Sequence, residues 1–117
     1  MIIDKGWGHE NIFVSNDDYC GKLLVFDKDK EFFMHFHVDK KETWYVLEGF
    51  FELELLNTDD ASIIKKTLNT GDVWTNERLE PHRLRCVGDK GVILEVSTKD
   101  TKEDNYRVFP GDSQKIS

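Results

Sequence analysis

Two histidines separated by one residue, His35 and His37, restrict what this chain can fold into more than any other feature of its sequence. In a β-strand successive side chains point to opposite faces, so both imidazoles project the same way from Cα atoms roughly 6–7 Å apart. Glu42 begins an aromatic and β-branched run over residues 43–47 that predicts the next strand, with residues 38–41 as the connection. Two neighbouring strands would therefore bring two imidazoles and one carboxylate together.

A fourth candidate ligand, His82, lies far downstream in the segment GDVWTNERLEPHR. In this segment Gly71 opens a turn before a short strand, and His82 follows Pro81 at the start of another strand. Only a closed β architecture would return His82 to the first histidine pair. The remaining histidine, His9, is expected to be an ordinary satisfied or exposed side chain.

Apolar and polar residues alternate with a period of two along several segments, which predicts half-buried β-strands. Residues 51–55 alternate in this way, and their two glutamates are expected to face solvent. From His82 onward, the alternation places Leu84 and Cys86 on the face of His82 and turns Arg83 to the opposite face.

Turn signals separate the predicted strands, among them residues 48–49 and 89–91. About ten short strands, turn signals every 8 to 12 residues and no helix of convincing length predict an antiparallel barrel or sandwich. With 117 residues, the chain is expected to form one domain over 1–117.

The charge and cysteine content narrow the classes of partner. A net charge of -7 argues against nucleic acid or an anionic membrane surface, so a small molecule is the expected ligand. Cys20 and Cys86 have no CxxC spacing, and the N-terminus lacks the pattern of a secretory signal, so we expect free thiols and a cytoplasmic location. No apolar run approaches the roughly 20 residues that span a bilayer.

The histidine pair and its surroundings carry a family resemblance. The pattern is HxH, four residues, Glu, six residues and Gly over His35, His37, Glu42 and Gly49, followed by Gly71 and by His82 eleven positions on. It resembles the two paired motifs of the cupin superfamily, small β-barrels with a metal near the middle. The resemblance implies a double-stranded β-helix, an all-β jelly-roll-like barrel.

The motifs depart from the cupin pattern at several positions, but not at the ligands. Asp29 stands where the first motif usually has a leading Gly, and Cys86 replaces the usual Asn of the second motif. Glu77 and Leu79 also replace the usual Pro and Gly there. Carried over residue by residue, the resemblance makes four side chains the metal ligands: His35, His37, Glu42 and His82.

The predicted ligand set does not name its metal. Three imidazoles and one carboxylate suit Fe(II), Mn(II), Zn(II), Co(II) or Ni(II) about equally, because nitrogen and oxygen ligands discriminate poorly within the first-row series. The sequence therefore predicts a divalent transition metal as the cofactor.

A closer resemblance links the chain to the cupin domain of type II mannose-6-phosphate isomerases, although two more residues separate the histidine pair from Glu42 than that pattern has. In that family the Pro-His-Arg stretch carries a ligand followed by a catalytic arginine, which implies a catalytic role for Arg83. The strand parity turns Arg83 away unless a bend at Pro81 re-aims it. The segments that carry the resemblance are Trp7-Gly8, Glu42-x-Trp44, Pro81-His82-Arg83-Leu84, residues 94–98 and Asn105-Tyr106-Arg107.

Three classes of function follow. The first is an isomerase of a sugar or sugar phosphate, in which the metal binds the carbonyl and adjacent hydroxyl and stabilises an enediolate; Trp44, on the face of Glu42, would bind the sugar or else belong to the core. The second is an Fe(II)-dependent dioxygenase of a small organic substrate, with Cys86 beside the substrate or else buried as an apolar side chain. The third is a non-catalytic sugar- or effector-binding module, because no general base is identifiable.

A homodimer is the expected assembly. An open β-barrel of this size leaves edge strands and an N-terminal segment with Trp7 that need cover.

Overall fold

The alternating segments form strands, and the strands form one curled antiparallel sheet. The computed structural model describes residues 1–109, in which there are nine strands and no helix. Among these residues, therefore, no helix has the length and apolar character needed to cross a membrane. The strands are β1 (Ile2–Lys5), β2 (Gly8–Ser15), β3 (Cys20–Asp27), β4 (Met34–Phe36), β5 (Glu42–Leu56), β6 (Ile63–Leu68), β7 (Val73–Asn76), β8 (His82–Ser97) and β9 (Tyr106–Phe109).

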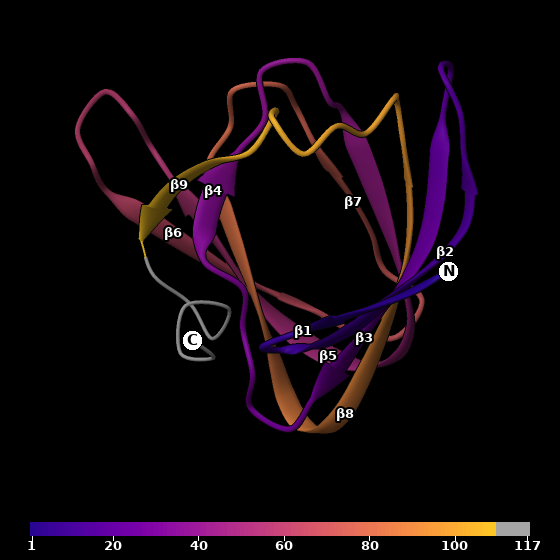
Figure 1. The fold of residues 1–117 in the computed structure, drawn as a ribbon. Coiled ribbons are helices and arrows are strands. Elements are labelled where there is room, and N and C mark those ends of the chain that lie inside the picture. Colours follow the sequence, from indigo (N-terminus) through magenta and orange to yellow (C-terminus); the bar gives the residue numbers. More distant parts are fainter. Residues whose placement is uncertain (110–117) are drawn as a thin grey trace.

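Two long strands, β5 and β8, connect the two halves of the molecule. They pair antiparallel over nearly their whole length, from Glu42 opposite Ser97 to Leu55 opposite His82. The first half of β5 also pairs with β7, on the edge that faces away from β8. The second half of β8 also pairs with β3. From β3 the sheet continues to β2 and then to β1. The other end of β5 pairs with β6, and the other end of β8 pairs with β4, which in turn pairs with β9. The sheet thus curls into two layers that share β5 and β8 (Figure 1).

The turns predicted at residues 48–49 and 89–91 are wrong, because both segments lie inside continuous strands. The register between β5 and β8 shifts on both sides of Glu48, where β5 bends. Gly49 has a φ of 82°, and a Cβ there would lie 2.5 Å from the carbonyl oxygen of Lys90. The glycine signals therefore mark where two paired strands bend together, and each strand continues beyond its bend.

Aromatic side chains fill the space between the layers. Trp7 stacks on Phe26 with ring centroids 4.5 Å apart, and Phe26 also meets Phe51 edge to face at 5.1 Å. Fully burying one such side chain stabilises the fold by about 1.5–3 kcal/mol. Trp7 is 4% exposed, so this chain covers it without a partner, and that reason for expecting a dimer fails.

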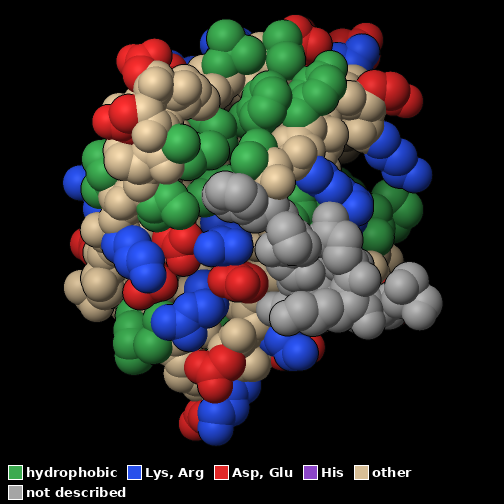
Figure 2. All heavy atoms as spheres, turned by 90° about the vertical axis from the view of Figure 1, so that its left-hand side faces the viewer, with side chains coloured by type: hydrophobic (Ala, Val, Ile, Leu, Met, Phe, Trp, Pro, Cys, Tyr) green, Lys and Arg blue, Asp and Glu red, His purple; other side chains and the backbone are tan. Residues whose placement is uncertain are grey.

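The outer surface is uneven in character. On the side that carries β4, β6 and β9, hydrophobic side chains gather in the upper part of the face, and charged side chains of both signs gather in the lower part (Figure 2). One prediction for the outside of the barrel is wrong: Glu54 is buried, because its carboxylate accepts a 2.7 Å hydrogen bond from Arg83.

The bend at Gly49 gives a test of the fold. Gly49→Ala should destabilise the protein by more than Gly71→Ala, for which a left-handed φ of 92° with nothing within 4 Å of the new Cβ implies about 1–2 kcal/mol. The added cost at Gly49 comes from the clash with the Lys90 carbonyl. Urea unfolding of both variants measures the difference, and equal losses of stability would contradict the packing at the bend.

Candidate metal centre

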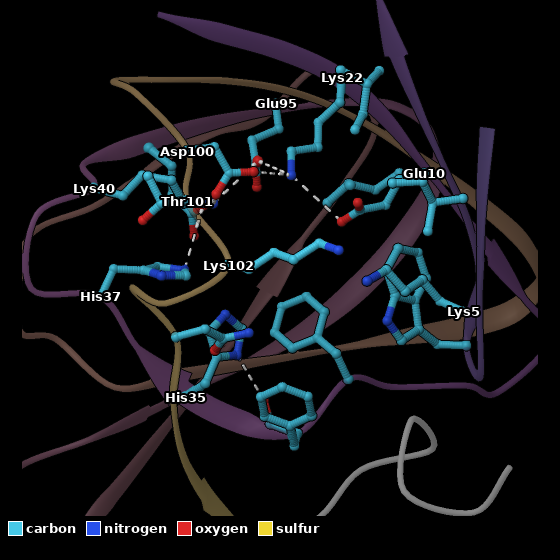
Figure 3. Close-up of a pocket in the computed structure, with 18 of the residues that line it drawn as sticks. Lys5, Glu10, Lys22, His35, His37, Lys40, Glu95, Asp100, Thr101 and Lys102 are labelled. Carbon is cyan, nitrogen blue, oxygen red and sulfur yellow. Dashed lines mark hydrogen bonds and ion pairs between the residues drawn. The ribbon is translucent and has the colours of Figure 1, made fainter. Parts of the chain in front are cut away.

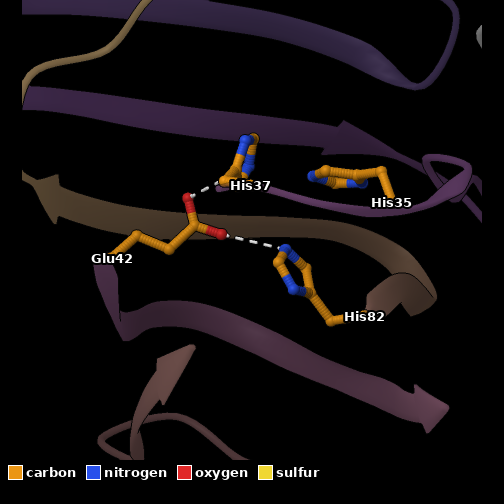
Figure 4. A group of neighbouring side chains, drawn as sticks. All are labelled: His35, His37, Glu42 and His82. Atoms are coloured by element: carbon orange, nitrogen blue, oxygen red, sulfur yellow. Dashed lines mark ion pairs between the residues drawn. The ribbon is translucent and has the colours of Figure 1, made fainter. Parts of the chain in front are cut away.

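Four side chains from three parts of the chain meet inside the barrel. His35 lies on β4 and His37 follows the end of that strand, while Glu42 and His82 are the first residues of β5 and β8. The sheet places His35 directly opposite His82. One donor atom from each of the four residues lies within 4.8 Å of the others, and all four residues are buried (Figure 4).

Backbone carbonyls fix the orientation of all three imidazoles. Nδ1 of His35 bonds the carbonyl oxygen of Phe33 at 2.8 Å, and Nδ1 of His82 bonds that of Glu80 at 2.9 Å. Nδ1 of His37 bonds the carbonyl oxygen of Asp104. A carbonyl only accepts hydrogen bonds, so each Nδ1 carries a proton, and in the neutral ring Nε2 is left with its lone pair.

The same Asp104 holds the connection between His37 and Glu42. Its carboxylate accepts backbone hydrogen bonds from Val38 at 2.6 Å, from Asp39 and from Lys40 at 2.8 Å. The side chain is buried, although it belongs to the segment between β8 and β9. One residue therefore fixes both the ring of His37 and the loop that leads to Glu42.

The free ring nitrogens face a carboxylate. Nε2 of His82 lies 3.0 Å from Oε1 of Glu42, and Nε2 of His37 lies 4.0 Å from Oε2. Both nitrogens are buried and neither makes a hydrogen bond. The nitrogen lone pairs and the carboxylate oxygens repel each other. A cation placed between them would attract both and remove this repulsion. The donor set therefore suits a metal ion.

The protonation states also favour metal binding. Burial lowers the pKa of His35 well below its ordinary value and, together with Lys40, lowers that of His37. Burial alone would raise the pKa of Glu42, but Lys40 and His82 hold it well below its ordinary value. His35 and His37 are thus held toward the neutral form and Glu42 toward the ionised form, which are the forms that bind a divalent first-row ion.

A network of buried charges adjoins the cluster. Lys40 lies 3.1 Å from Glu42, 3.7 Å from Glu95 and 3.4 Å from Asp100. Lys22 lies 2.8 Å from Asp100, 3.7 Å from Glu95 and 3.5 Å from Glu10 (Figure 3). Burial opposes the charge of both lysines, but the surrounding carboxylates keep the pKa of each above its ordinary value.

Glu95 is the buried carboxyl of this network that lies next to Glu42. Burial and the charge of Glu42 raise the pKa of Glu95 to about 7. Its Oε1 accepts a 2.9 Å hydrogen bond from Nε1 of Trp44, whereas its Oε2 accepts none. Oε2 of Glu95 is therefore buried without a hydrogen bond, 3.7 Å from the ammonium groups of Lys22 and Lys40.

Three members of the cluster, His35, His37 and Glu42, line one cavity of about 600 Å³ together with the charged network, whereas His82 does not line it. It is lined by parts of β1, β2 and β3, by the segment after β8, and by His35, His37, Glu42, Trp44 and Glu95. Trp44, predicted to contact substrate, lies in this wall with 1% of its surface exposed, and its ring meets His82 edge to face at 5.4 Å. The cavity is large enough for a small organic molecule.

Like His82, two further residues that the sequence analysis assigned to the site do not line this cavity. Arg83 lies on the opposite face of β8, as strand parity predicted, where it bonds Glu54 at 2.7 Å and lies 3.7 Å from Glu31. Cys86 is fully buried in the hydrophobic core. A catalytic role for Arg83 and a substrate contact for Cys86 stay predictions.

Several residues of the site were missed by sequence reasoning. A signal existed for Lys22 and Glu95, since each is a charged residue within an apolar run of its strand, at a position whose parity points inward. No local pattern distinguishes Lys40, Asp100 or Asp104 from other charged loop residues. Their roles depend on contacts between segments far apart in the sequence.

The structure resembles known β-proteins, although no family model and no curated protein sequence matches the chain. The capsular polysaccharide assembling protein CapF from Staphylococcus aureus has a TM-score of 0.83 and 16% identity, over 93% of this chain and 34% of CapF. Oxalate decarboxylase from Lactobacillus farciminis has a TM-score of 0.78 and 16% identity, over 92% of this chain and 33% of that protein. KdgF from Halomonas sp. has a TM-score of 0.70 and 19% identity, over 81% of each chain.

These similarities establish the fold. The chain spans about a third of the length of CapF and of oxalate decarboxylase. At such low identities the likeness shows the architecture alone, which is the double-stranded β-helix of cupins. The predicted fold class is confirmed, whereas the closer resemblance to mannose-6-phosphate isomerases stays a prediction.

The four predicted ligands lie close together, so the removal of one of them should weaken metal binding. His35→Ala and His82→Ala should each weaken the binding of Mn(II) or Zn(II) at least about tenfold, because each removes one of four donors around the ion. His9→Ala, the control, should leave binding unchanged. Metal analysis after equilibration and desalting measures the effect, and undiminished metal in both ligand variants would contradict the assignment.

Proposed function

We propose that this protein is a metal-dependent isomerase of a sugar or sugar phosphate, similar in function to mannose-6-phosphate isomerases. The observation that carries the proposal is the buried cluster of three imidazoles and one carboxylate, of which two imidazoles and the carboxylate line a cavity of about 600 Å³. The residues that would hold the ion are His35, His37, Glu42 and His82. CapF is a capsular polysaccharide assembling protein, which supports a carbohydrate ligand for this fold.

The ion and the protein would divide the chemistry between them. A divalent ion at this cluster would supply a Lewis acid for a carbonyl and its neighbouring hydroxyl. Isomerisation removes a proton from the carbon that bears the hydroxyl and returns a proton to the former carbonyl carbon, while a second proton moves between the two oxygens. The enzyme must therefore supply a group that accepts and returns a proton.

Glu95 is the candidate for this proton transfer. It lines the cavity and is not one of the four proposed ligands, and its Oε2 makes no hydrogen bond. Lys22 and Lys40 each lie 3.7 Å from this oxygen, where they stabilise its charge, and Trp44 fixes the other oxygen. The main argument for a non-catalytic binding module was that no proton-transfer group could be identified in the sequence. The Glu95 carboxyl supplies such a group and therefore favours an enzyme.

Trp44 would act as a wall beside the substrate. Its ring nitrogen is occupied by Glu95, and its ring packs against His82 and Phe32. Since only 1% of its surface is exposed, its contribution is the shape of the cavity next to the cluster, with little area left for stacking on a sugar.

We also propose that the protein forms a homodimer. Among the described residues, β6 pairs only with β5, and β9 ends the path of paired strands, so both are edges on the same side of the barrel (Figure 1). Ile64 of β6 and Tyr106 of β9 are 52% and 46% exposed. A second copy would cover such edges. Light scattering at micromolar concentration should give twice 13.7 kDa, and a mass of 13.7 kDa would reject the dimer.

The isomerase proposal is tested on the metal-loaded protein. A panel of aldoses, ketoses and their phosphates is incubated with and without air, and products are followed by NMR in deuterated water. We expect interconversion without oxygen, with deuterium entering at the carbon next to the carbonyl. Glu95→Gln should lower turnover by about 10²–10⁴-fold while metal is retained, and Arg83→Ala should leave turnover intact, because its ion pairs lie outside the cavity.

Each other class of function has its own signature in this experiment. Oxygen uptake together with no anaerobic product would indicate the Fe(II)-dependent dioxygenase. A rise in melting temperature with a sugar but no product under either condition would indicate the binding module. Loss of turnover in Arg83→Ala without loss of stability would support the catalytic role predicted for that residue.

A further inference from the structure

Three basic side chains that line the cavity have no acidic partner within residues 1–109. They are Lys5 at the end of β1, Lys102 in the segment between β8 and β9, and Arg107 on β9, all of which line the cavity. Within residues 1–109, none of the three lies in an ion pair with a carboxylate. Lys102 extends from its segment into the space between His35 and Lys5 (Figure 3).

The deep lysines of the same cavity differ in this respect. Lys22 and Lys40 are each 5% exposed at the side chain and are surrounded by the carboxylates of Glu10, Glu95 and Asp100. Their charges are thus already matched within the protein. The free positive charge belongs to the outer residues, which come from three separate elements and meet only because the sheet is curled.

The charge of the cavity contrasts with that of the whole protein. Five basic and five acidic side chains line it, although the protein as a whole has a net charge of -7. A divalent ion at the proposed metal centre would make the cavity positive. An anionic group is therefore attracted to the cavity of a protein whose remaining surface repels anions.

The position of Arg107 joins this positive region to the proposed metal centre. Arg107 pairs with His35 across β4 and β9, and its guanidinium lies 4.2 Å from the centre of the Phe33 ring. This contact holds the guanidinium by a cation–π interaction and leaves its hydrogen-bond donors without a carboxylate. The outer cations and the metal cluster therefore line one cavity, within the span of a small molecule.

We propose that Lys102, with Lys5 and Arg107, forms an anion subsite that binds a phosphate or carboxylate on the sugar. This inference rests on the proposed function, which places the carbonyl and hydroxyl of the sugar at the metal cluster. The anionic group would lie at the other end of the same sugar. The substrate class is thereby narrowed to sugars that carry an anionic group away from the reacting carbons. Lys102 is the specificity residue, because its side chain enters the cavity (Figure 3).

Non-reactive probes test the subsite separately from the reaction. Glucitol 6-phosphate, gluconate and neutral glucitol have no carbonyl group to isomerise, and calorimetry on the Zn(II)-loaded protein measures the affinity of each. We expect glucitol 6-phosphate or gluconate to bind at least about tenfold more tightly than glucitol, with the preference weakening at high salt. The anionic probe whose binding Lys102→Gln weakens identifies the group as phosphate or carboxylate, because a carboxylate bound only to Zn(II) would not respond to Lys102.

Substitutions in the segment between β8 and β9 show which side chain is responsible for the preference for anionic probes. Lys102→Gln should weaken the anionic probe about fivefold to tenfold and leave glucitol unchanged, and Lys102→Arg should keep the charge-dependent binding. Lys99→Gln is the matched control, since Lys99 lies in the same segment but pairs with Asp17 at 3.1 Å outside this cavity. Equal affinity for charged and neutral probes, or an equal effect of the Lys102 and Lys99 variants, would overturn the subsite.

The two proposals fail in different ways. Anion-dependent binding that requires Lys102, with no isomerisation of any sugar, would keep the subsite and reject the isomerase. Turnover of neutral sugars that Lys102→Gln does not change would keep the isomerase and reject the subsite.

Discussion

The antiparallel pairing of β5 with β8 is the constraint on which the site depends. Glu42 begins one strand and His82 begins the other, so the two residues lie at opposite ends of the paired ladder. They can meet only because both strands bend together near Gly49 and the sheet curls back on itself. The same curl places β4 beside the start of β8, which sets His35 opposite His82.

Electrostatics then determines what the enclosed space can hold. All three imidazoles have their Nδ1 atoms bonded to backbone carbonyls, and the free Nε2 atoms of His37 and His82 face the carboxylate of Glu42. Burying these imidazoles and the carboxylate without a cation leaves ring nitrogens without a hydrogen-bond partner, which costs free energy. Lys22 and Lys40 next to this cluster form ion pairs with the neighbouring carboxylates, so both buried lysine charges are matched within the protein.

Much of this arrangement could be predicted from the sequence, because it depends on local periodicity. The HxH spacing gave His35 and His37 a common face, and strand parity placed His82 and Cys86 inward and Arg83 outward. Parity could also have identified Glu95 and Lys22, whose charges interrupt apolar strands. What could not be predicted depends on distant contacts: Asp104 bonds a loop more than sixty residues earlier, and Lys40 is buried only because Asp100 and Glu95 surround it. Gly49 and Gly91 predict hairpin turns although both lie inside continuous strands, because a local sequence signal cannot distinguish a turn from a bend that two paired strands share.

The most direct measurement of the metal centre is an anomalous difference map from crystals grown with Zn(II) or Mn(II), recorded at the absorption edge of the metal. We expect a peak about 2.0–2.3 Å from Nε2 of His35, His37 and His82 and from a carboxylate oxygen of Glu42. Coordination through Nε2 is required, since backbone carbonyls occupy each Nδ1. A metal-saturated crystal with no peak among these four side chains, or with the ion bound elsewhere, would contradict the proposed centre.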